Sequence, residues 1–233
     1  LNLDFEYYGD LDNTTINNYT SFVKKITKAV HSQIPDSRVS LDAYSDAVAK
    51  KRIFDIPKIV QIVDQVIIMG YDFHRLNSVN AGPVAPLFGK DKYEYDIYTA
   101  VTDYIKVMPA NKVILAVPFY GYEWPTLTSE KGSPVISSAH GPEISSYKRS
   151  LLTAKDNNAT INFDDESKSA WFSYFDKDNN DFRQVWFENE RSLGLKFDLV
   201  NQAGLSGLGI WALGYDGADA NLLWQTVFDK FNH

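Results

Sequence analysis

Apolar, β-branched stretches alternate along this chain with stretches of helical periodicity, and this alternation restricts the possible folds more than any other feature. Strands are expected at residues 1–7, 38–44, 66–71, 113–119 and 208–213, and helices at 16–30, 56–63, 95–108, 188–203 and 222–231. Asn13 and Thr14 offer N-cap oxygens to the first helix. Because the strands are apolar on both faces and helices separate them, they predict a parallel sheet covered by helices. The fold class is therefore α/β, either a barrel or a doubly wound sheet.

The pattern changes between residues 123 and 184, where Gly, Ser, Pro and Asn separate short strand-like pieces. Residues 171–175 and 182–187 flank the sequence DKDNND like the two arms of a hairpin. We predict an inserted small α+β lobe at 123–184, with 1–122 and 185–233 forming one larger domain. Outside the lobe about five strand–helix units remain, so an eight-unit barrel would need about three more before Leu1, from upstream sequence or from another chain.

Composition excludes several functional classes. The chain has 23 Lys and Arg against 30 Asp and Glu, a net charge of −7, which argues against nucleic acid as a partner. Cysteine is absent, which excludes disulfides, cysteine nucleophiles and thiolate metal sites. The histidines lack zinc-ligand spacing, and no metal or cofactor is expected. No run approaches the ~20 apolar residues of a membrane span, and the first residues do not resemble a signal peptide.

Two carboxylates stand close together near the start of the chain. Asn2, Asp4 and Glu6 are spaced by two residues on the expected first strand, so their side chains should leave the same face. Proximity of two acids raises the pKa of one of them, which provides a protonated general acid beside an ionised partner. The alternative, of about equal weight from these residues alone, is a solvated strand end that pairs with Lys or Arg.

Further candidate residues lie where expected strands end, which is where the active sites of parallel barrels lie. The sequence MGYDFH, residues 69–74, places Tyr71 and Asp72 at such an end. Considered alone, an Asp at this position more often caps the following loop. Aromatic residues at strand ends can stack against sugar rings or belong to the core, and singly the core is the better interpretation. Those found here are Tyr120, Tyr122, Trp124 and Trp211.

Taken together, LNLDFEY, MGYDFH, VPFYGYEW and GIWALGYD occur in an order and spacing that resemble the chitinase-like glycoside hydrolase family 18. LNLDFEY resembles the second half of the family's D-G-x-D-x-D-x-E signature on the fourth barrel strand, and the other three resemble its motifs on strands six, seven and eight. The resemblance covers essentially the whole chain. It implies a TIM (β/α)8 barrel of which this chain supplies about strands 4 to 8, with the α+β insertion after strand 7.

The resemblance also implies roles for individual residues. Glu6 matches the general acid/base, and Asp4 matches the carboxylate that orients the substrate's N-acetyl group, whose oxygen is the nucleophile in this family. Tyr71 and Asp72 resemble residues that hydrogen-bond this acetamide. Trp211 resembles the floor of the sugar subsite. Tyr120, Met69 and Trp124 are expected to contact the substrate as well.

One departure from the family's pattern concerns the charge of the site. Asn2 stands where the family commonly has an Asp, which removes a negative charge and should make Asp4 easier to ionise. Asn at this position also makes the chain look more like bacterial or archaeal members, some of which cut peptidoglycan in spore cortex.

The expected function is therefore retaining hydrolysis of β-1,4 bonds next to N-acetylglucosamine in chitin or chitooligosaccharides. The alternatives are a peptidoglycan N-acetylglucosaminidase of the same family, or a non-catalytic chitin-binding lectin on the same barrel. The partner is a polysaccharide that contains N-acetylglucosamine. Polymer substrates imply secretion to the extracellular space or the cell wall, with any signal peptide upstream.

Overall fold

The computed structural model describes residues 1–7, 9–217 and 221–232. The chain divides into two compact units, each of which gathers segments that are distant in sequence. The first unit consists of Leu1–Gly70, Tyr98–Ala116 and Val200–Gly209, and the second consists of Tyr71–Ile97, Val117–Leu199 and Ile210–His233.

A parallel sheet forms the centre of the first unit. Its strand order is β1-β2-β3-β4-β10, which follows the order of the sequence. The strands are β1 (Asn2–Leu3), β2 (Ser40–Tyr44), β3 (Gln65–Met69), β4 (Val113–Pro118) and β10 (Gly207–Trp211). The parallel sheet with intervening helices confirms the predicted α/β class. The closed barrel and the assignment of its strands 4 to 8 stay predictions.

Helices connect the strands of this sheet along the chain. Those of the first unit are α1 (Asn13–Gln33), α2 (Ile56–Ile59), α4 (Ile97–Val107) and the 3-10 turn η1 (Ala110–Lys112), whereas α6 (Glu190–Gln202) belongs mostly to the second unit. On α4, the buried hydroxyl of Tyr104 donates to the backbone carbonyl of Tyr44 at 2.7 Å, which ties the helix to the end of β2. The cap of α1 differs from the prediction. Asp12, not Asn13 or Thr14, is the N-cap, because its carboxylate accepts the backbone N–H of Thr15 at 2.6 Å.

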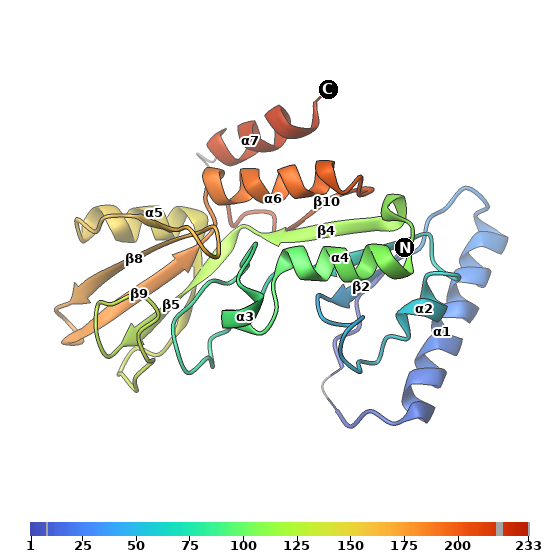
Figure 1. The fold of residues 1–233 in the computed structure, drawn as a ribbon, viewed down its shortest axis with the longest axis horizontal. Helices are drawn as coiled ribbons and strands as arrows, with labels where there is room; N and C mark the ends of the chain where they lie inside the picture. Colours follow the sequence, from blue (N-terminus) through green and yellow to red (C-terminus); the bar gives the residue numbers. More distant parts are fainter. Residues whose placement is uncertain (8, 218–220, 233) are drawn as a thin grey trace. The chain divides into compact units, whose positions relative to one another are not determined.

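An antiparallel sheet forms the centre of the second unit (Figure 1), with the order β6-β5-β9-β8-β7. Its strands are β5 (Tyr120–Thr126), β6 (Glu143–Ser146), β7 (Asn162–Asp164), β8 (Ser169–Asp176) and β9 (Asp181–Phe187). The unit also contains the helices α3 (Lys90–Tyr93), α5 (Tyr147–Asp156) and α7 (Asn221–Phe231). The predicted hairpin is confirmed, since β8 and β9 pair from Ala170↔Phe187 to Asp176↔Asp181. The boundaries of the lobe at 123 and 184 stay a prediction.

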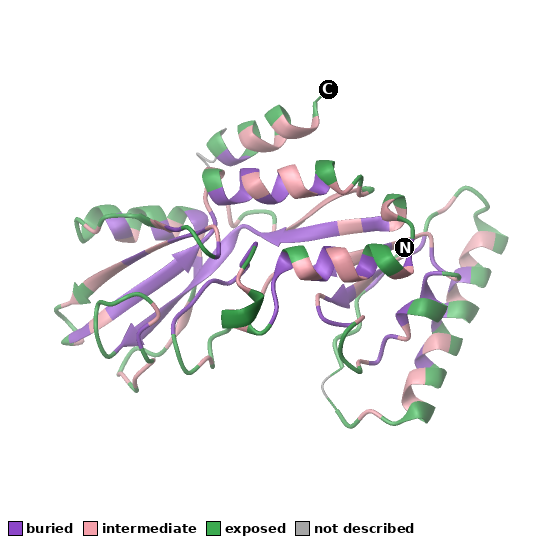
Figure 2. Ribbon diagram, in the orientation of Figure 1, coloured by how far each residue is buried: buried purple, intermediate pink, exposed green. Residues whose placement is uncertain are grey.

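Burial in the antiparallel sheet is greatest along β5 and β9, which Figure 2 shows largely in purple. The two strands approach so closely at Gly121 that a Cβ there would lie 1.9 Å from the carbonyl oxygen of Trp186. Only glycine therefore fits at this position. After β9, the side chains of Glu188 and Lys196 form a fully buried ion pair at 2.6 Å, with exposed fractions of 1% and 0%.

The first strand is shorter than predicted. We expected residues 1–7 to be extended and paired, but regular pairing with β2 ends at Leu3. The segment that follows is held by side chains instead, because Phe5 packs edge-on against Tyr19 and Phe22 of α1, with ring centroids 5.7 and 5.4 Å apart. Among the described helices, none is both long enough and apolar enough to cross a bilayer.

Candidate active site

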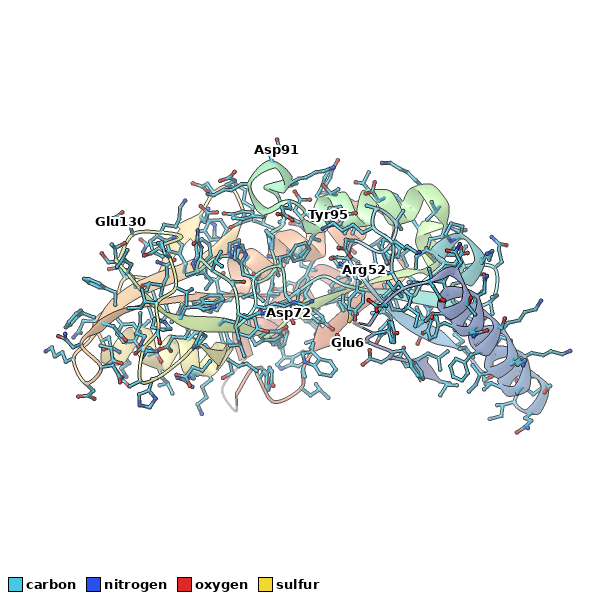
Figure 3. The ribbon with its side chains drawn as sticks, turned by 90° about the horizontal axis from the view of Figure 1, so that it is seen from below. Glu6, Arg52, Asp72, Asp91, Tyr95 and Glu130 are labelled. Carbon is cyan, nitrogen blue, oxygen red and sulfur yellow. The ribbon has the colours of Figure 1, made fainter. Side chains whose placement is uncertain are left out.

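The first group of candidate residues lies at and just after β1, in the first unit. Leu3 is buried in the sheet, whereas Asp4 and Glu6 are exposed. Figure 3 labels Glu6. Asn2 pairs with Ser40 and Leu3 pairs with Leu41, so that β1 runs beside β2. Asp4 and Glu6 therefore follow directly after β1, at a point where side chains of β2 lie alongside.

That neighbouring strand contributes an acid that the sequence reasoning did not single out. The amide nitrogen of Asn2 donates to Oδ2 of Asp42 at 2.8 Å, and the hydroxyl of Ser40 donates to Oδ1 of Asn2 at 2.7 Å. These two hydrogen bonds fix which way the amide of Asn2 faces. A single acid inside the apolar run VSLDAY was the available signal, but its meaning depends on which strand lies beside it.

The acids influence one another's protonation. Burial raises the pKa of Asp42 to about 6; the charges of Asp4 and Glu6 add to the increase, and the hydrogen bond from Asn2 opposes it. Partial burial of the carboxyl, and next the charge of Glu6, raise the pKa of Asp4. β2 supplies a carboxyl, Asp42, beside Asn2, and the expectation that Asn2 makes Asp4 easier to ionise stays a prediction. We call Asn2, Asp4, Glu6 and Asp42 the acid cluster.

A tyrosine of α1 faces this cluster. Tyr19 is 7% exposed, and its hydroxyl oxygen has no hydrogen-bond partner among the described residues. Burial and the charges of Asp4 and Asp42 raise the pKa of this phenol, so it stays protonated. Tyr19 thus adds a neutral donor beside the carboxyls.

The second group of candidate residues lies in the second unit, around Asp72 (Figure 3). Its carboxylate oxygen Oδ1 accepts hydrogen bonds from the hydroxyls of Tyr120 at 2.5 Å and Tyr122 at 2.8 Å. The two tyrosines are two residues apart on β5, which places them on one face of the strand. Burial and the negative charge of Asp72 raise the pKa of both phenols. Tyr122 was expected only as an aromatic residue, because sequence spacing does not reveal its carboxylate partner.

The backbone at Asp72 has a left-handed conformation, with φ of 62°. Asp tolerates this region better than most residues with a side chain. The next residue anchors the turn, because the backbone N–H of Phe73 donates to the carbonyl of Val84 at 3.0 Å. The turn therefore directs the carboxylate toward the two tyrosines. We call Asp72, Tyr120 and Tyr122 the acceptor cluster.

Aromatic rings surround the acceptor cluster. Tyr71 and Tyr215 each pack edge-on against Tyr120, at centroid distances of 6.2 and 5.9 Å. Trp124 packs against Tyr122 at 5.6 Å, is fully buried, and donates its indole N–H to the carbonyl of Arg75 at 3.0 Å. The structure thus places Trp124 behind the tyrosines and not at the surface.

The remaining predicted site residues differ in exposure. Trp211, at the end of β10, is 50% exposed, and its carbonyl accepts the backbone N–H of Phe119 at 2.8 Å. A half-exposed indole is available for stacking against a sugar face. Met69, at the end of β3 in the first unit, is 7% exposed. Within the described ranges, no group of three His, Cys, Asp or Glu side chains could hold a metal ion.

Comparisons with known proteins identify relatives over the whole chain. The chain is 28% identical to the cortical fragment-lytic enzyme of Bacillus subtilis (strain 168), over all of this chain and 49% of that protein. It is also 28% identical to the di-N-acetylchitobiase of Homo sapiens, over 97% of this chain and 61% of that protein. The chain thus spans about half to three fifths of the length of these curated relatives.

Solved structures share the fold. A chitinase from Chromobacterium violaceum superposes with a TM-score of 0.78 at 24% identity, over 100% of this chain and 66% of that one. A class V chitinase from Nicotiana tobaccum, solved in complex with NAG4, superposes with a TM-score of 0.81 at 17% identity, over 97% and 67% of the two chains. The family described as glycosyl hydrolases family 18 matches residues 1–216, and the chain belongs to this family.

Proposed function

We propose that this chain carries the catalytic machinery of a retaining glycoside hydrolase that cleaves β-1,4 bonds next to N-acetylglucosamine. The observation that carries the proposal is the acid cluster: in a family 18 chain, Asp4 and Glu6 stand on the family's motif and face a third carboxyl from β2. Family 18 is an exception to the two-carboxylate scheme of glycosidases, because the substrate's own acetamide is the nucleophile.

In the proposed reaction, Glu6 donates its proton to the glycosidic oxygen while the bond from that oxygen to the sugar's anomeric carbon breaks. The acetamide oxygen forms a bond to the same carbon, which gives a cyclic oxazolinium ion. Asp4 accepts a hydrogen bond from the acetamide N–H and stabilises the positive charge. Water then attacks the anomeric carbon and returns a proton to Glu6, so that two inversions retain the configuration.

The acceptor cluster and the surrounding aromatic residues are proposed to hold the sugar. Asp72, with Tyr71 and Tyr120, would hydrogen-bond the acetamide. Trp211 would stack against the sugar ring, for which its half-exposed indole is suited. Met69 and Trp124 were expected to touch the substrate. Because both are buried, we propose that they support the neighbouring residues from behind.

Two further proposals concern the fold and the location of the protein. We propose that β1, β2, β3, β4 and β10 are strands four to eight of a (β/α)8 barrel, and that residues 123–184 are a lobe inserted after the seventh. Their unbroken parallel order supports this proposal. An insoluble polymer as substrate implies action outside the cytoplasm, so we propose that the protein is secreted.

The choice of polymer is open to a direct comparison. Release of reducing ends should be measured on N-acetylchitooligosaccharides and on purified peptidoglycan, with the full-length protein and its Glu6→Gln variant. Similarity to a cortical fragment-lytic enzyme supports peptidoglycan, and similarity to di-N-acetylchitobiases supports chitooligosaccharides. Glu166→Gln is a matched control, since Glu166 is an exposed residue that pairs with Lys92 at 3.0 Å.

We expect Glu6→Gln to abolish turnover and Glu166→Gln to leave it unchanged. Turnover that persists in Glu6→Gln would overturn the assigned roles. If the unmodified protein binds oligosaccharides but turns over neither polymer, the protein is a lectin and the proposed enzymatic function is wrong.

A further inference from the structure

We propose that Asp42 is a positioning residue of the active site: its carboxyl, held by Asn2, carries a proton that lets Asp4 act as an anion. This inference rests on the proposed function and adds a residue to it. Family 18 enzymes commonly have an Asp where this chain has Asn2, and the chain regains the lost carboxyl from the neighbouring strand.

The hydrogen bonds around Asn2 support this assignment. Ser40 donates to the carbonyl oxygen of Asn2, which leaves the amide nitrogen to face Asp42 at 2.8 Å. The register Asn2↔Ser40 and Leu3↔Leu41 brings the start of the segment that carries Asp4 beside the strand that carries Asp42. The amide therefore holds Oδ2 of Asp42 in place through a neutral donor.

The second oxygen of Asp42 explains why the carboxyl holds a proton. Oδ1 is buried and accepts no hydrogen bond from any described residue. A buried carboxyl oxygen without a hydrogen-bond donor is more unfavourable as an anion than in the neutral, protonated form. One oxygen is thus fixed by Asn2, and the other is suited to carry the proton.

The charges that face Asp42 act in the same direction. Asp4 and Glu6 oppose its ionisation, and the phenol of Tyr19 on α1 stays neutral. On β3 its register partner is Ile67, which is apolar. Within the described part of the chain Asp42 has no ion pair. A proton on Asp42 therefore reduces the repulsion that an ionised Asp4 would meet.

This arrangement predicts a kinetic signature. Below pH 6 Asp42 is neutral, and the proposal assigns the negative charge of the cluster to Asp4, which accepts the acetamide N–H. As the pH rises through about 6, Asp42 loses its proton, and the negative charge beside Asp4 grows. The value of kcat/KM should fall above this inflection, by up to about tenfold at pH 7 if only the protonated form is active.

The test compares pH profiles of kcat/KM on N-acetylchitooligosaccharides and peptidoglycan. In Asp42→Asn the side chain cannot ionise, so the inflection near pH 6 should disappear and activity should persist to higher pH. The double variant Asn2→Asp/Asp42→Asn returns the carboxyl to position 2 and should restore an inflection. Asp103→Asn is the matched control, since Asp103 pairs with Lys106 on α4 and its loss should leave the profile unchanged.

Several results would overturn the inference. These are an unchanged profile in Asp42→Asn, a folded Asp42→Asn variant that is inactive at every pH, or a double variant that behaves like Asp42→Asn. If the unmodified protein hydrolyses neither polymer, the proposed function fails separately. Carboxyl ¹³C NMR then still decides the inference, because an Asp42 that titrates like an ordinary exposed Asp would refute it.

Discussion

The buried ion pair between Glu188 and Lys196 offers a sharp test of the packing of the second unit. Their charged atoms lie 2.6 Å apart, and both side chains are essentially inaccessible. The hydroxyl of Ser169 donates to the other carboxylate oxygen at 3.3 Å. Burial raises the pKa of Glu188 and lowers that of Lys196, and their mutual attraction opposes both shifts. Each charge is therefore stable only while its partner is present.

Removal of one partner leaves the other buried and uncompensated. We expect Lys196→Met or Glu188→Leu to lower the free energy of unfolding by about 3–5 kcal/mol. At this chain length, that corresponds to a fall in Tm of roughly 6–20 °C. The double variant replaces the pair by apolar side chains and should lie within about 1 kcal/mol of the unmodified protein.

Urea and thermal unfolding of the four proteins gives a double-mutant cycle. Lys92→Met is the control, because Lys92 and Glu166 are each about half exposed and such a pair contributes about 0–1 kcal/mol. A single variant at Lys196 that loses less than about 1 kcal/mol would refute the reasoning, since the remaining carboxylate would then have access to water.

Three further predictions concern the clusters and the sheet. Tyr120→Phe should lower stability and kcat/KM more than Tyr122→Phe, because Tyr120 makes the shorter of the two hydrogen bonds to the Asp72 carboxylate. Each of these bonds contributes about 1.5–3 kcal/mol. Equal losses for the two variants in denaturation and in kinetics would contradict the prediction. Gly121→Ala should lower Tm strongly or prevent folding, since its Cβ would meet a backbone oxygen at 1.9 Å; wild-type stability by calorimetry would show that β5 and β9 are farther apart. The pKa of Asp42 rises to about 6 on folding, so its contribution to the free energy of unfolding should be full below about pH 4 and lost as the pH passes 6. The contribution is at most about 3 kcal/mol. In unfolding measured against pH, Asp42→Asn should lack this decrease of stability with rising pH.

Much of the fold followed from the periodicity of the sequence. Every expected strand of the parallel sheet and the hairpin between β8 and β9 are present, because long apolar runs and turn residues are local signals. Features that depend on a single hydrogen bond were harder to predict from the sequence. The N-cap of α1 lies one residue before the expected caps, because Asp12 takes the role expected of Asn13.

Candidate site residues could be recognised from the sequence only where they lie together within one short segment. Asp4 and Glu6 stand two residues apart in one motif, so one segment is enough to suggest that they act together, and their roles stay predictions. Asp42 meets Asn2, 40 residues away in sequence, through the pairing of two strands. Tyr122 meets Asp72, 50 residues away in sequence, through a turn. A single sequence does not show which distant side chains will meet.

The left-handed backbone at Asp72 limits the substitutions that evolution can try at this position. At a φ of 62° most side chains are disfavoured, above all branched ones, whereas Asp and Asn are tolerated. Replacement by Asn would keep a carbonyl oxygen for the hydroxyls of Tyr120 and Tyr122. In a relative that no longer needs the carboxylate, replacement of Asp72 by Asn would thus be tolerated, whereas few other substitutions would be. Among descendants, this cluster should change its charge more readily than its shape.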